Sequence, residues 1–584
     1  MSDLQHTPDS YHHLVRVARG EEPADLVLRN GTLVNVFTRE VLPATVGICG
    51  DTIAYITTPD DHRCAGHTVI DVTGKTLAPG LIDSHMHIES THVTPARFAD
   101  AVLPLGVTTV AQDPHEMANV LGLEGVTYMR HAARGLPLRV LTFVPTCVPA
   151  VPGLETSGAE FTAHEVAMLL DDPDGRGEII GLAEVMDYWG VVRQAPRITE
   201  IVKAGRERNV ILTGHVRFED LRDLNAYLAT GIESDHGRMT PDLIETYARL
   251  GMIVEVCCAP HRDNIAEAVA VWERFGSLET VVFVTDDVSP NELAAEGHLD
   301  RGVRRAIALG MNPVDAIRAA SLLPARRLRR RNLGAIAPGF SADLIVLNDL
   351  STFNVHLTVA SGNIVARDGA MVKPAHSAIQ PPAGATHSVH LASTHASDFV
   401  PGWLNSTEVP IITERGKGMR RLKQHEEFAN WRTDPDLALV TVWHRHGHNA
   451  NTFTTLIAGT GLREGALAST YAHDCHNLIV IGRDAADMAT AANALIASGG
   501  GYVAVASGEV RALAALPVGG ILAEKPVAEL AQDFDAFVEA ARIQGVNNDP
   551  ITLLSSLPLP VSPGFRPTDM GLVDVAKQKF VKKG

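Results

Sequence analysis

The sequence predicts a mixed α/β protein whose central part is a TIM-like (α/β)8 barrel. Eight apolar, strand-like runs alternate with stretches of helical periodicity between residues 80 and 286. Short β-type runs lie on both sides of this part, and a region of different composition begins near residue 389. At 584 residues the chain is longer than one hydrophobic core usually supports, so several domains are expected.

The barrel prediction depends on the number and order of the strand-like runs. They cover residues 80–88, 106–112, 138–148, 178–186, 209–216, 231–236, 252–258 and 279–286. Eight strand-helix units in this length are typical of a closed barrel. A doubly wound open sheet is the structural alternative. It needs a reversal of strand order, and no Gly-x-Gly-x-x-Gly loop follows any of these strands.

A small β-sheet domain is expected to flank the barrel and to be built from both sides of it. Residues 24–56 contain β-type runs separated by Asn-Gly and Gly-Asp turns, and a similar set follows at 339–347 and 355–372. The expected division is 1–78 and 334–373 for the two parts of this domain, 79–333 for the barrel, 374–388 for a Pro-rich linker and 389–584 for a C-terminal α+β domain.

Composition and charge exclude several classes of protein. The net charge of −18 is spread along the chain, and the one basic run, 326–331, is short, so nucleic acid polymers are not expected partners. This run could bind phosphate, although a solvated helix end is the simpler interpretation. Six scattered cysteines and the absence of an uninterrupted apolar stretch of about 18 residues predict a cytoplasmic protein without a membrane partner.

The strongest local signal is a pair of histidines at the end of the first barrel strand. His85 and His87 follow Pro-Gly-Leu-Ile-Asp, and on a strand their side chains point to the same face. Neutral imidazoles are good ligands of divalent transition metals. Two solvated loop histidines are the alternative. However, TIM-barrel enzymes place their active sites at the carboxyl ends of the barrel strands, which is the position of this pair.

Four further side chains lie where later strand runs give way to loops. These are Glu184, His215, His236 and Asp286. Each alone could be a helix cap or a surface residue. Together with His85 and His87 they exceed the needs of one tetrahedral ion, whereas two ions sharing a bridging carboxylate would use them all. We therefore expect a binuclear site with Glu184 as the bridge.

Longer motifs carry a resemblance to a known family. They are Pro-Gly-Leu-Ile-Asp-Ser-His-Met-His-Ile-Glu-Ser at 79–90, Asp-Pro-His-Glu-Met-Ala-Asn-Val at 113–120, Gly-Leu-Ala-Glu-Val-Met-Asp-Tyr at 181–188, Thr-Asp-Asp at 285–287 and Glu-Gly-His-Leu-Asp at 296–300, with His-Asp-Cys-His-Asn, Gly-Gly-Gly and Leu-Pro-Val-Gly-Gly in the C-terminal region. This arrangement resembles the amidohydrolase superfamily and, within it, the adenine deaminases. The resemblance spans nearly the whole chain.

The resemblance implies a reaction and roles for individual residues. Two divalent ions, manganese or iron with zinc as an alternative, would supply a bridging hydroxide that adds to C6 of adenine, giving hypoxanthine and ammonia in purine salvage. Asp286 would bind one ion and accept the proton of the hydroxide, and Glu116 would donate to the ring nitrogen. The remaining candidates are Asp113 and Asp287, which would orient the base or the ligands, and Glu89, His115 and His298, which would line the substrate pocket. Asp113 could equally be a turn residue, and Glu89 a salt-bridge partner.

Some features leave alternatives open. His215 is followed by Val216-Arg217-Phe218 and His236 by Gly237, which departs from the family pattern around the substrate pocket. The C-terminal cluster His473, Asp474 and His476 could bind a metal, reach the active-site mouth from its own or a neighbouring subunit, or form a hydrogen-bonded turn.

A homo-oligomer is expected. The competing functions are another amidohydrolase, acting on a cyclic amide or a different nucleobase C–N bond, and a catalytically silent scaffold.

Overall fold

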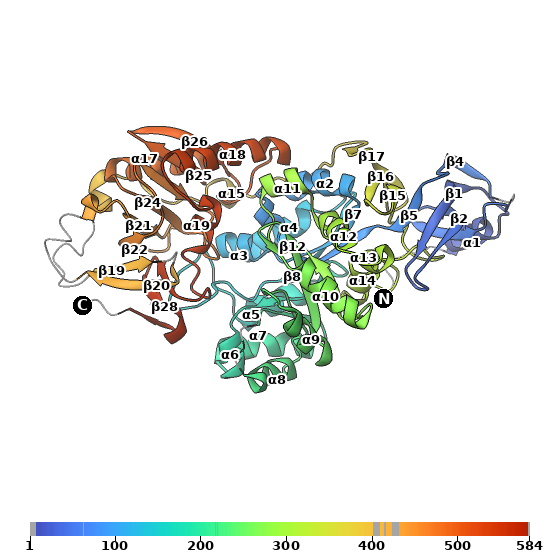
Figure 1. Cartoon of the computed structure of the whole chain (residues 1–584), viewed down its shortest axis with the longest axis horizontal. Coiled ribbons are helices and arrows are strands. Elements are labelled where there is room, and N and C mark those ends of the chain that lie inside the picture. The colour runs from blue at the N-terminus through green and yellow to red at the C-terminus, as the bar shows by residue number, and fades with distance from the viewer. Residues whose placement is uncertain are drawn as a thin grey trace.

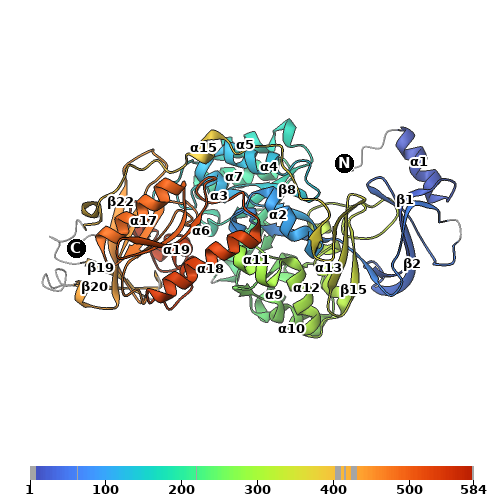
Figure 2. The same cartoon turned by 90° about the horizontal axis from the view of Figure 1, so that it is seen from above.

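The barrel lies between two β-rich parts of the chain, and all three are arranged in a row in both views (Figures 1 and 2). The computed structural model describes residues 8–61, 64–216, 218, 220–400, 409–413, 416–422 and 431–581. Arg217, in one of the two family departures, lies outside the described residues. The helices of this part of the chain include none that is both long and apolar enough to cross a membrane.

Eight parallel strands form the barrel, in agreement with the predicted runs. They are β6 (Leu81–Met86), β7 (Val107–Gln112), β8 (Arg139–Val144), β9 (Ile179–Val185), β10 (Ile211–Gly214), β11 (Ser234–Asp235), β12 (Ile253–Ala259) and β14 (Val281–Val284). Strands β6 to β10 pair in chain order, and β12 pairs with both β11 and β14. The Asp286 N–H donates to the carbonyl of His85, and the Glu233 N–H donates to the carbonyl of Leu212, which closes the ring. The open-sheet alternative is therefore wrong.

Helices follow the strands and cover the outside of the barrel. They are α2 (Pro95–Val102), α3 (His115–Leu121), α4 (Leu123–Ala132), α5 (Ala163–Leu170), α6 (Tyr188–Val192), α7 (Pro196–Glu207), α8 (Leu221–Ala229), α9 (Pro241–Arg249), α10 (Ile265–Phe275), α11 (Pro290–Glu296), α12 (Leu299–Ala308), α13 (Pro313–Ala319) and α14 (Leu322–Arg327). Several begin with proline in the first turn, where the missing N–H costs no helical hydrogen bond.

The flanking sheet is assembled from both sides of the barrel, as predicted. Its strands are β1 (Ala24–Asn35), β2 (Glu40–Cys49), β3 (Thr52–Thr57), β4 (Gly66–Asp71), β5 (Thr76–Pro79), β15 (Leu344–Asp349), β16 (Asn354–Ala360), β17 (Asn363–Arg367) and β18 (Ala370–Met371), and helix α1 is Pro8–Ala18. The two halves join where β15 pairs antiparallel with β5. Because β5 leads directly into β6, this sheet fixes the start of the first barrel strand.

The C-terminal α+β domain has an eight-stranded sheet. Its strands are β19 (Val409–Thr413), β20 (Gly418–Leu422), β21 (Leu437–Trp443), β22 (Thr452–Ala458), β23 (Ala466–Ser469), β24 (Leu478–Gly482), β25 (Gly501–Ala506) and β26 (Glu509–Ala515). A small sheet of β27 (Phe565–Thr568), β28 (Gly571–Asp574) and β29 (Lys579–Phe580) follows. The helices are α17 (Ala485–Ser498), α18 (Val527–Ile543) and α19 (Pro550–Ser556), and the short α15 (Ala383–Thr386) lies in the predicted linker.

Two sets of contacts hold the C-terminal domain against the barrel mouth. Helix α18 packs on α11, and the two lie side by side in Figure 2. The segment after β6 pairs with the segment after β26, with the Ala523 N–H donating to the carbonyl of His92 at 2.8 Å. The loops of the barrel mouth therefore face side chains from the C-terminal domain.

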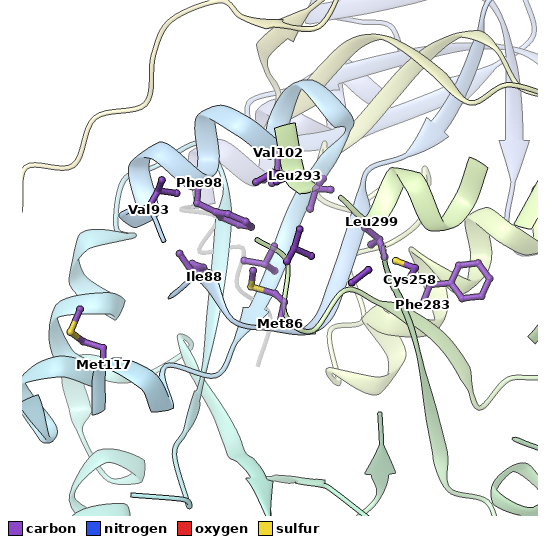
Figure 3. Packing of buried hydrophobic residues seen from close by; sticks show 14 of the residues in the cluster. Met86, Ile88, Val93, Phe98, Val102, Met117, Cys258, Phe283, Leu293 and Leu299 are labelled. Atoms are coloured by element: carbon purple, nitrogen blue, oxygen red, sulfur yellow. The ribbon is translucent and has the colours of Figure 1, made fainter. Parts of the chain in front are cut away.

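A continuous apolar core supports the first barrel strand. Figure 3 shows Phe98 and Val102 of α2 near Met86 of β6, Leu293 of α11 and Leu299 of α12. All five side chains are buried. Side chains from α2, α11 and α12 therefore pack against the segment that carries the His-x-His pair. This packing gives the two imidazoles a rigid base.

Candidate metal centre

The barrel brings all six predicted ligands to one place at the carboxyl ends of its strands. His85 lies in β6 and His87 just after it, Glu184 lies in β9, and the other three follow β10, β11 and β14. Five of the six side chains are buried, and His215 is partly buried. Each strand ends in a loop at this edge, so side chains distant in sequence converge here.

The first subset of ligands is His85, His87 and Asp286. Asp286 Oδ1 lies 3.5 Å from His85 Nε2 and 3.2 Å from His87 Nε2. The backbone of Asp286 has a φ of 60°, a left-handed conformation that a non-glycine residue adopts only when its surroundings hold it there. Pairing of residue 286 with Met86 provides that restraint and directs the carboxylate toward the two histidines.

The second subset is joined to the first through Glu184. Its Oε2 lies 2.6 Å from His215 Nδ1 and 3.1 Å from His236 Nε2, while its Oε1 lies 3.7 Å from His87 Nε2. One carboxylate thus reaches ligands of both subsets, each with a different oxygen. This is the geometry expected of a bridge between two ions.

The donor set fits divalent metal ions. Both ring nitrogens of His85 and the Nδ1 of His236 are buried without a hydrogen-bond partner among the described residues. Burial, together with His236, lowers the pKa of His85 to about 3, so this ring is neutral and can act as a ligand. Unpaired imidazole nitrogens beside two carboxylates would be costly in a buried site without a cation to bind them.

Contacts behind the ligands fix the orientation of the imidazoles. The Nδ1 of His87 donates to the backbone carbonyl of Asp113 at 3.0 Å, which leaves Nε2 to face the carboxylates. Glu255, in the middle of β12, lies beneath two other ligands: its oxygens are 3.8 Å from His85 Nδ1 and 3.9 Å from His236 Nδ1. The sequence interpretation missed Glu255 because it sits inside an apolar strand run rather than at the strand end.

The basic run at 326–331 is not uniformly a solvated helix end. Arg327 is buried and forms an ion pair with Glu255, and its guanidinium also donates to the carbonyl of Ser84. The adjacent Arg326 is exposed and pairs with Glu279 on the surface. The solvated interpretation is therefore wrong for Arg327, because the last turn of α14 carries one arginine inward and the next outward.

Two cavities flank the ligand cluster. One, of about 550 Å³, is lined by His215, Trp189 and Phe218. The other, of about 440 Å³, is lined by Asp287, Arg262, Ser90 and His473. Phe218, which belongs to the departure after His215, thus contributes an aromatic side chain to the first cavity. Arg262 also contacts Asp286 through an ion pair, so a cation from β13 (Arg262–Asp263) reaches the ligand cluster.

Glu116 lies at the contact between the barrel and the C-terminal domain. His473 Nδ1 is 2.6 Å from its Oε1, His476 Nε2 is 2.5 Å from its Oε2, and the Tyr471 hydroxyl donates to Oε1 at 3.1 Å. Of the three interpretations of the C-terminal cluster, a reach to the active-site mouth from the same chain is the one that these contacts support.

The remaining candidate residues occupy different surroundings. Asp113 accepts a hydrogen bond from His115 Nδ1 at 3.0 Å, and Asp287 accepts one from Ser90 at 2.5 Å. Glu89 is buried beside α3, accepting from the Met117 N–H, and burial raises its pKa to about 8. His298 bonds to Thr285 and packs against Phe98 in the core, and it lines neither of the two cavities described above.

Comparison with known proteins agrees with this geometry. Residues 76–365 match the model of the amidohydrolase family, and residues 411–579 match that of the adenine deaminase C-terminal domain. An adenine deaminase 2 of Rhizobium meliloti (strain 1021) is 39% identical over 576 residues, covering 97% of this chain and 96% of the relative. The chain belongs to the adenine deaminase family. A second member of the family, from Serratia proteamaculans (strain 568), is 38% identical, with 97% and 96% coverage.

Solved structures outside the adenine deaminase family are more distant. An adenosine deaminase from Xanthomonas campestris with bound zinc covers 60% of this chain and 95% of its own, with 17% identity and a TM-score of 0.44. A β-aspartyl dipeptidase from Fervidobacterium islandicum AW-1 covers 60% and 98%, with 18% identity and a TM-score of 0.45.

Proposed function

We propose that this protein hydrolyses adenine to hypoxanthine and ammonia at a binuclear site formed by the six converging side chains. The observation that carries the proposal is the position of Glu184, whose two oxygens reach His87 on one side and His215 with His236 on the other. Near-full-length similarity to adenine deaminases supports the choice of substrate.

The metal pair is proposed to be manganese or iron, with zinc as an alternative. His85, His87 and Asp286 would hold one ion, His215 and His236 the other, and Glu184 both, as the distances among these side chains suggest. When bound, two divalent ions lower the pKa of a shared water so that it becomes a nucleophile at neutral pH. The mixed imidazole and carboxylate set suits all three metals, so the donors alone do not select among them.

The chain's own residues then account for orientation and proton transfer. Asp286 is the candidate acceptor of the proton from the attacking water, because its Oδ1 faces the histidine pair at the barrel mouth. Asp287 would orient the base through the cavity that it shares with Arg262. Burial alone would raise the pKa of Asp287, but His87, His473 and Arg262 lower it, so this group is an acceptor and not a donor.

Asp113 is proposed to support the ligands and the pocket. Its backbone carbonyl accepts from His87 Nδ1, and its carboxylate holds His115 beside Glu184. Glu89 and His115 remain candidates for the pocket wall. His298 would act on the pocket from behind, through Thr285, because its Nε2 contacts the Thr285 hydroxyl at 3.2 Å.

A deaminase screen tests the proposed function. Protein loaded with manganese is incubated with adenine, adenosine, guanine, cytosine and a cyclic amide, and ammonia release is measured together with ultraviolet absorbance. Conversion of adenine alone is expected. Activity on adenosine or the cyclic amide without activity on adenine would overturn the substrate and leave the metal site standing.

Metal analysis separates an enzyme from a silent scaffold. Two ions per chain, with activity lost on chelation and regained on adding manganese, are expected. Fewer than one ion per chain and no gain with manganese would favour the scaffold.

A homo-oligomer is a further prediction, and light scattering of the metal-loaded protein measures it.

A further inference from the structure

Three side chains of the C-terminal domain converge on one carboxylate of the barrel. Glu116, in α3, is fully buried, and its two oxygens accept from Tyr471, His473 and His476 at 3.1, 2.6 and 2.5 Å. Both oxygens are therefore already occupied by donors. This saturation leaves the carboxylate little capacity to carry a proton of its own to a substrate.

The protonation state of Glu116 follows from these neighbours. Burial would raise its pKa, but His473, His476 and His115 hold the pKa well below its usual range. The group is thus an anion at neutral pH. A general acid must hold a transferable proton at the working pH. Among Glu116 and the side chains that contact it, the general acid therefore has to be one of the partners of Glu116.

His476 is unsuited to that role. Its Nδ1 accepts a hydrogen bond from the Ala472 N–H at 3.2 Å, so its single hydrogen is on Nε2 and is donated to Glu116. Burial lowers the pKa of His476 to about 4, so the ring is neutral. His476 is therefore a fixed hydrogen-bond donor, and Arg445, which donates to its backbone carbonyl, fixes it further.

His473 differs from His476 in both respects. Its Nδ1 contacts Glu116, and its side chain is partly exposed, whereas that of His476 is fully buried. The ring lines the 440 Å³ cavity together with Asp287 and Arg262, and 16% of the side chain is exposed. Burial opposes its charge, but Glu116 raises the pKa of His473 to about 9. This imidazole is protonated at neutral pH and reaches the cavity.

The lining of the cavity joins His473 to side chains that neighbour the candidate metal ligands. Asp287 follows the ligand Asp286 directly in the chain, and Ser90, which donates to Asp287, is also 3.0 Å from the Tyr471 hydroxyl. On the opposite side, His115 Nε2 is 3.6 Å from Glu116 and its Nδ1 is 4.0 Å from Glu184. A planar base bound here would lie between the ligand cluster and His473.

We propose that His473 of the C-terminal domain protonates the purine ring, with Glu116 as its buried counter-ion and with His476 and Tyr471 as positioning residues. The proposal rests on adenine hydrolysis as the function of the site. It makes the C-terminal domain part of the active site and assigns to His473 the step that resemblance suggests for Glu116.

The hydrogens of the reaction balance under this assignment. The attacking water contributes its oxygen to C6, and its two hydrogens end on N1 of hypoxanthine and on ammonia. His473 gives its proton to N1 and recovers one from the water as the latter is activated. Asp286 carries the second hydrogen to the departing amine as the C6–N bond breaks, and no external oxidant or reductant is needed.

The test is the substitution His473→Asn in the full-length, manganese-loaded protein. Asparagine can still donate to Glu116 but cannot carry a proton, so the hydrogen bond is retained while the acid is lost. We expect kcat for adenine to fall about 10²- to 10⁴-fold, with KM changed only a few-fold and two ions still bound. Added imidazole should restore part of the rate.

The pH profile distinguishes acid catalysis from a purely structural role. Wild-type kcat should decline on the alkaline side as His473 loses its proton, and this limb should be absent from His473→Asn. His476→Gln, which keeps a donor, should lower kcat about 10-fold and retain the limb. His387→Asn, at an exposed position directly after α15, is the matched control and should behave as wild type.

The outcomes separate this proposal from the function on which it rests. An active wild type together with a His473→Asn variant of unchanged kcat or unchanged alkaline limb would overturn only the role of His473. A wild type that binds two ions but does not deaminate adenine would overturn the proposed function and this role with it. If His473→Asn does not fold, His473→Gln and imidazole rescue provide the same comparison.

Discussion

Arg327 and Glu255 form an ion pair directly beneath the histidines of the candidate metal centre, where neither side chain is accessible to solvent. Glu255 in turn lies below His85 and His236, which belong to different ligand subsets. One buried carboxylate thus supports imidazoles on both sides of Glu184. Buried pairs of this kind need not add net stability, but they restrict the orientations of their neighbours.

Substituting Arg327 should lower the stability of the fold, because Glu255 is left buried without its partner. Arg327→Met is expected to reduce the free energy of unfolding by about 3–5 kcal/mol, because a buried charge loses its partner. Arg326→Met is the matched control, since Arg326 forms an exposed pair with Glu279, and its effect should stay within about 1 kcal/mol. Urea unfolding of the metal-loaded protein measures both, and equal losses would contradict the prediction.

Glu255→Gln should act on the metal rather than on the chemistry. The variant keeps the shape of the side chain but removes the charge that faces His85 and His236. Metal affinity is expected to fall about 10- to 100-fold, as for other residues that orient ligands. Competition with a chelator gives the affinity, and saturating manganese should return most of the activity. An unchanged affinity would show that the ion pair has no part in holding the ligands.

Glu184→Gln tests the bridging role. Glu184 contacts ligands of both subsets, so the change is expected to reduce bound metal from two ions per chain to one or fewer. Metal content by mass spectrometry after gel filtration is the measurement. Glu207→Gln, at an exposed position in α7, should retain both ions. Two tightly bound ions in Glu184→Gln would exclude this carboxylate as the bridge.

The docking of the C-terminal domain depends in part on Asp569. Its carboxylate accepts from the backbone and hydroxyl of Thr156 on a barrel loop and from Asn451. Asp569→Ala removes a charged acceptor from these partly buried donors and should cost about 1–3 kcal/mol. Faster proteolysis within residues 374–388 is the expected readout, with the exposed Asp535→Ala as control. Identical cleavage rates would mean that other contacts hold the domain.

The sequence predicts the barrel and the six candidate ligands that converge at its mouth, because both depend on local patterns. A strand followed by a polar residue at its carboxyl end, as at Asp286, is visible in one short window. Glu255 and Arg327 were missed because their meaning arises only when β12 and α14 meet in the fold. The C-terminal contact with Glu116 joins residues more than 350 positions apart, so no local pattern could specify it.

The pair formed by His473 and Glu116 predicts a specific dependence of stability on pH. The pKa of His473 is raised from 6.5 to about 9 in the folded protein, so its contribution is complete below pH 6.5 and is lost as the pH rises through 9. A shift of this size corresponds to at most about 3 kcal/mol. The pKa of Glu116 is lowered, so its own contribution is present above pH 4.5 and is lost only in more acidic solution.

Melting temperatures between pH 6.5 and 9.5 provide the measurement. The wild type should lose stability across this window more steeply than His473→Asn, which lacks the titrating group. The titratable groups that face His473 are Glu116, Asp287, Asp474, His476, His92 and Tyr471. Both proteins retain these groups and the buried carboxyl of Glu89, whose pKa burial raises to about 8, so the difference between the two curves isolates His473. Parallel curves would mean that His473 is not charged in the folded protein, and the ion pair with Glu116 would have to be replaced by a neutral hydrogen bond.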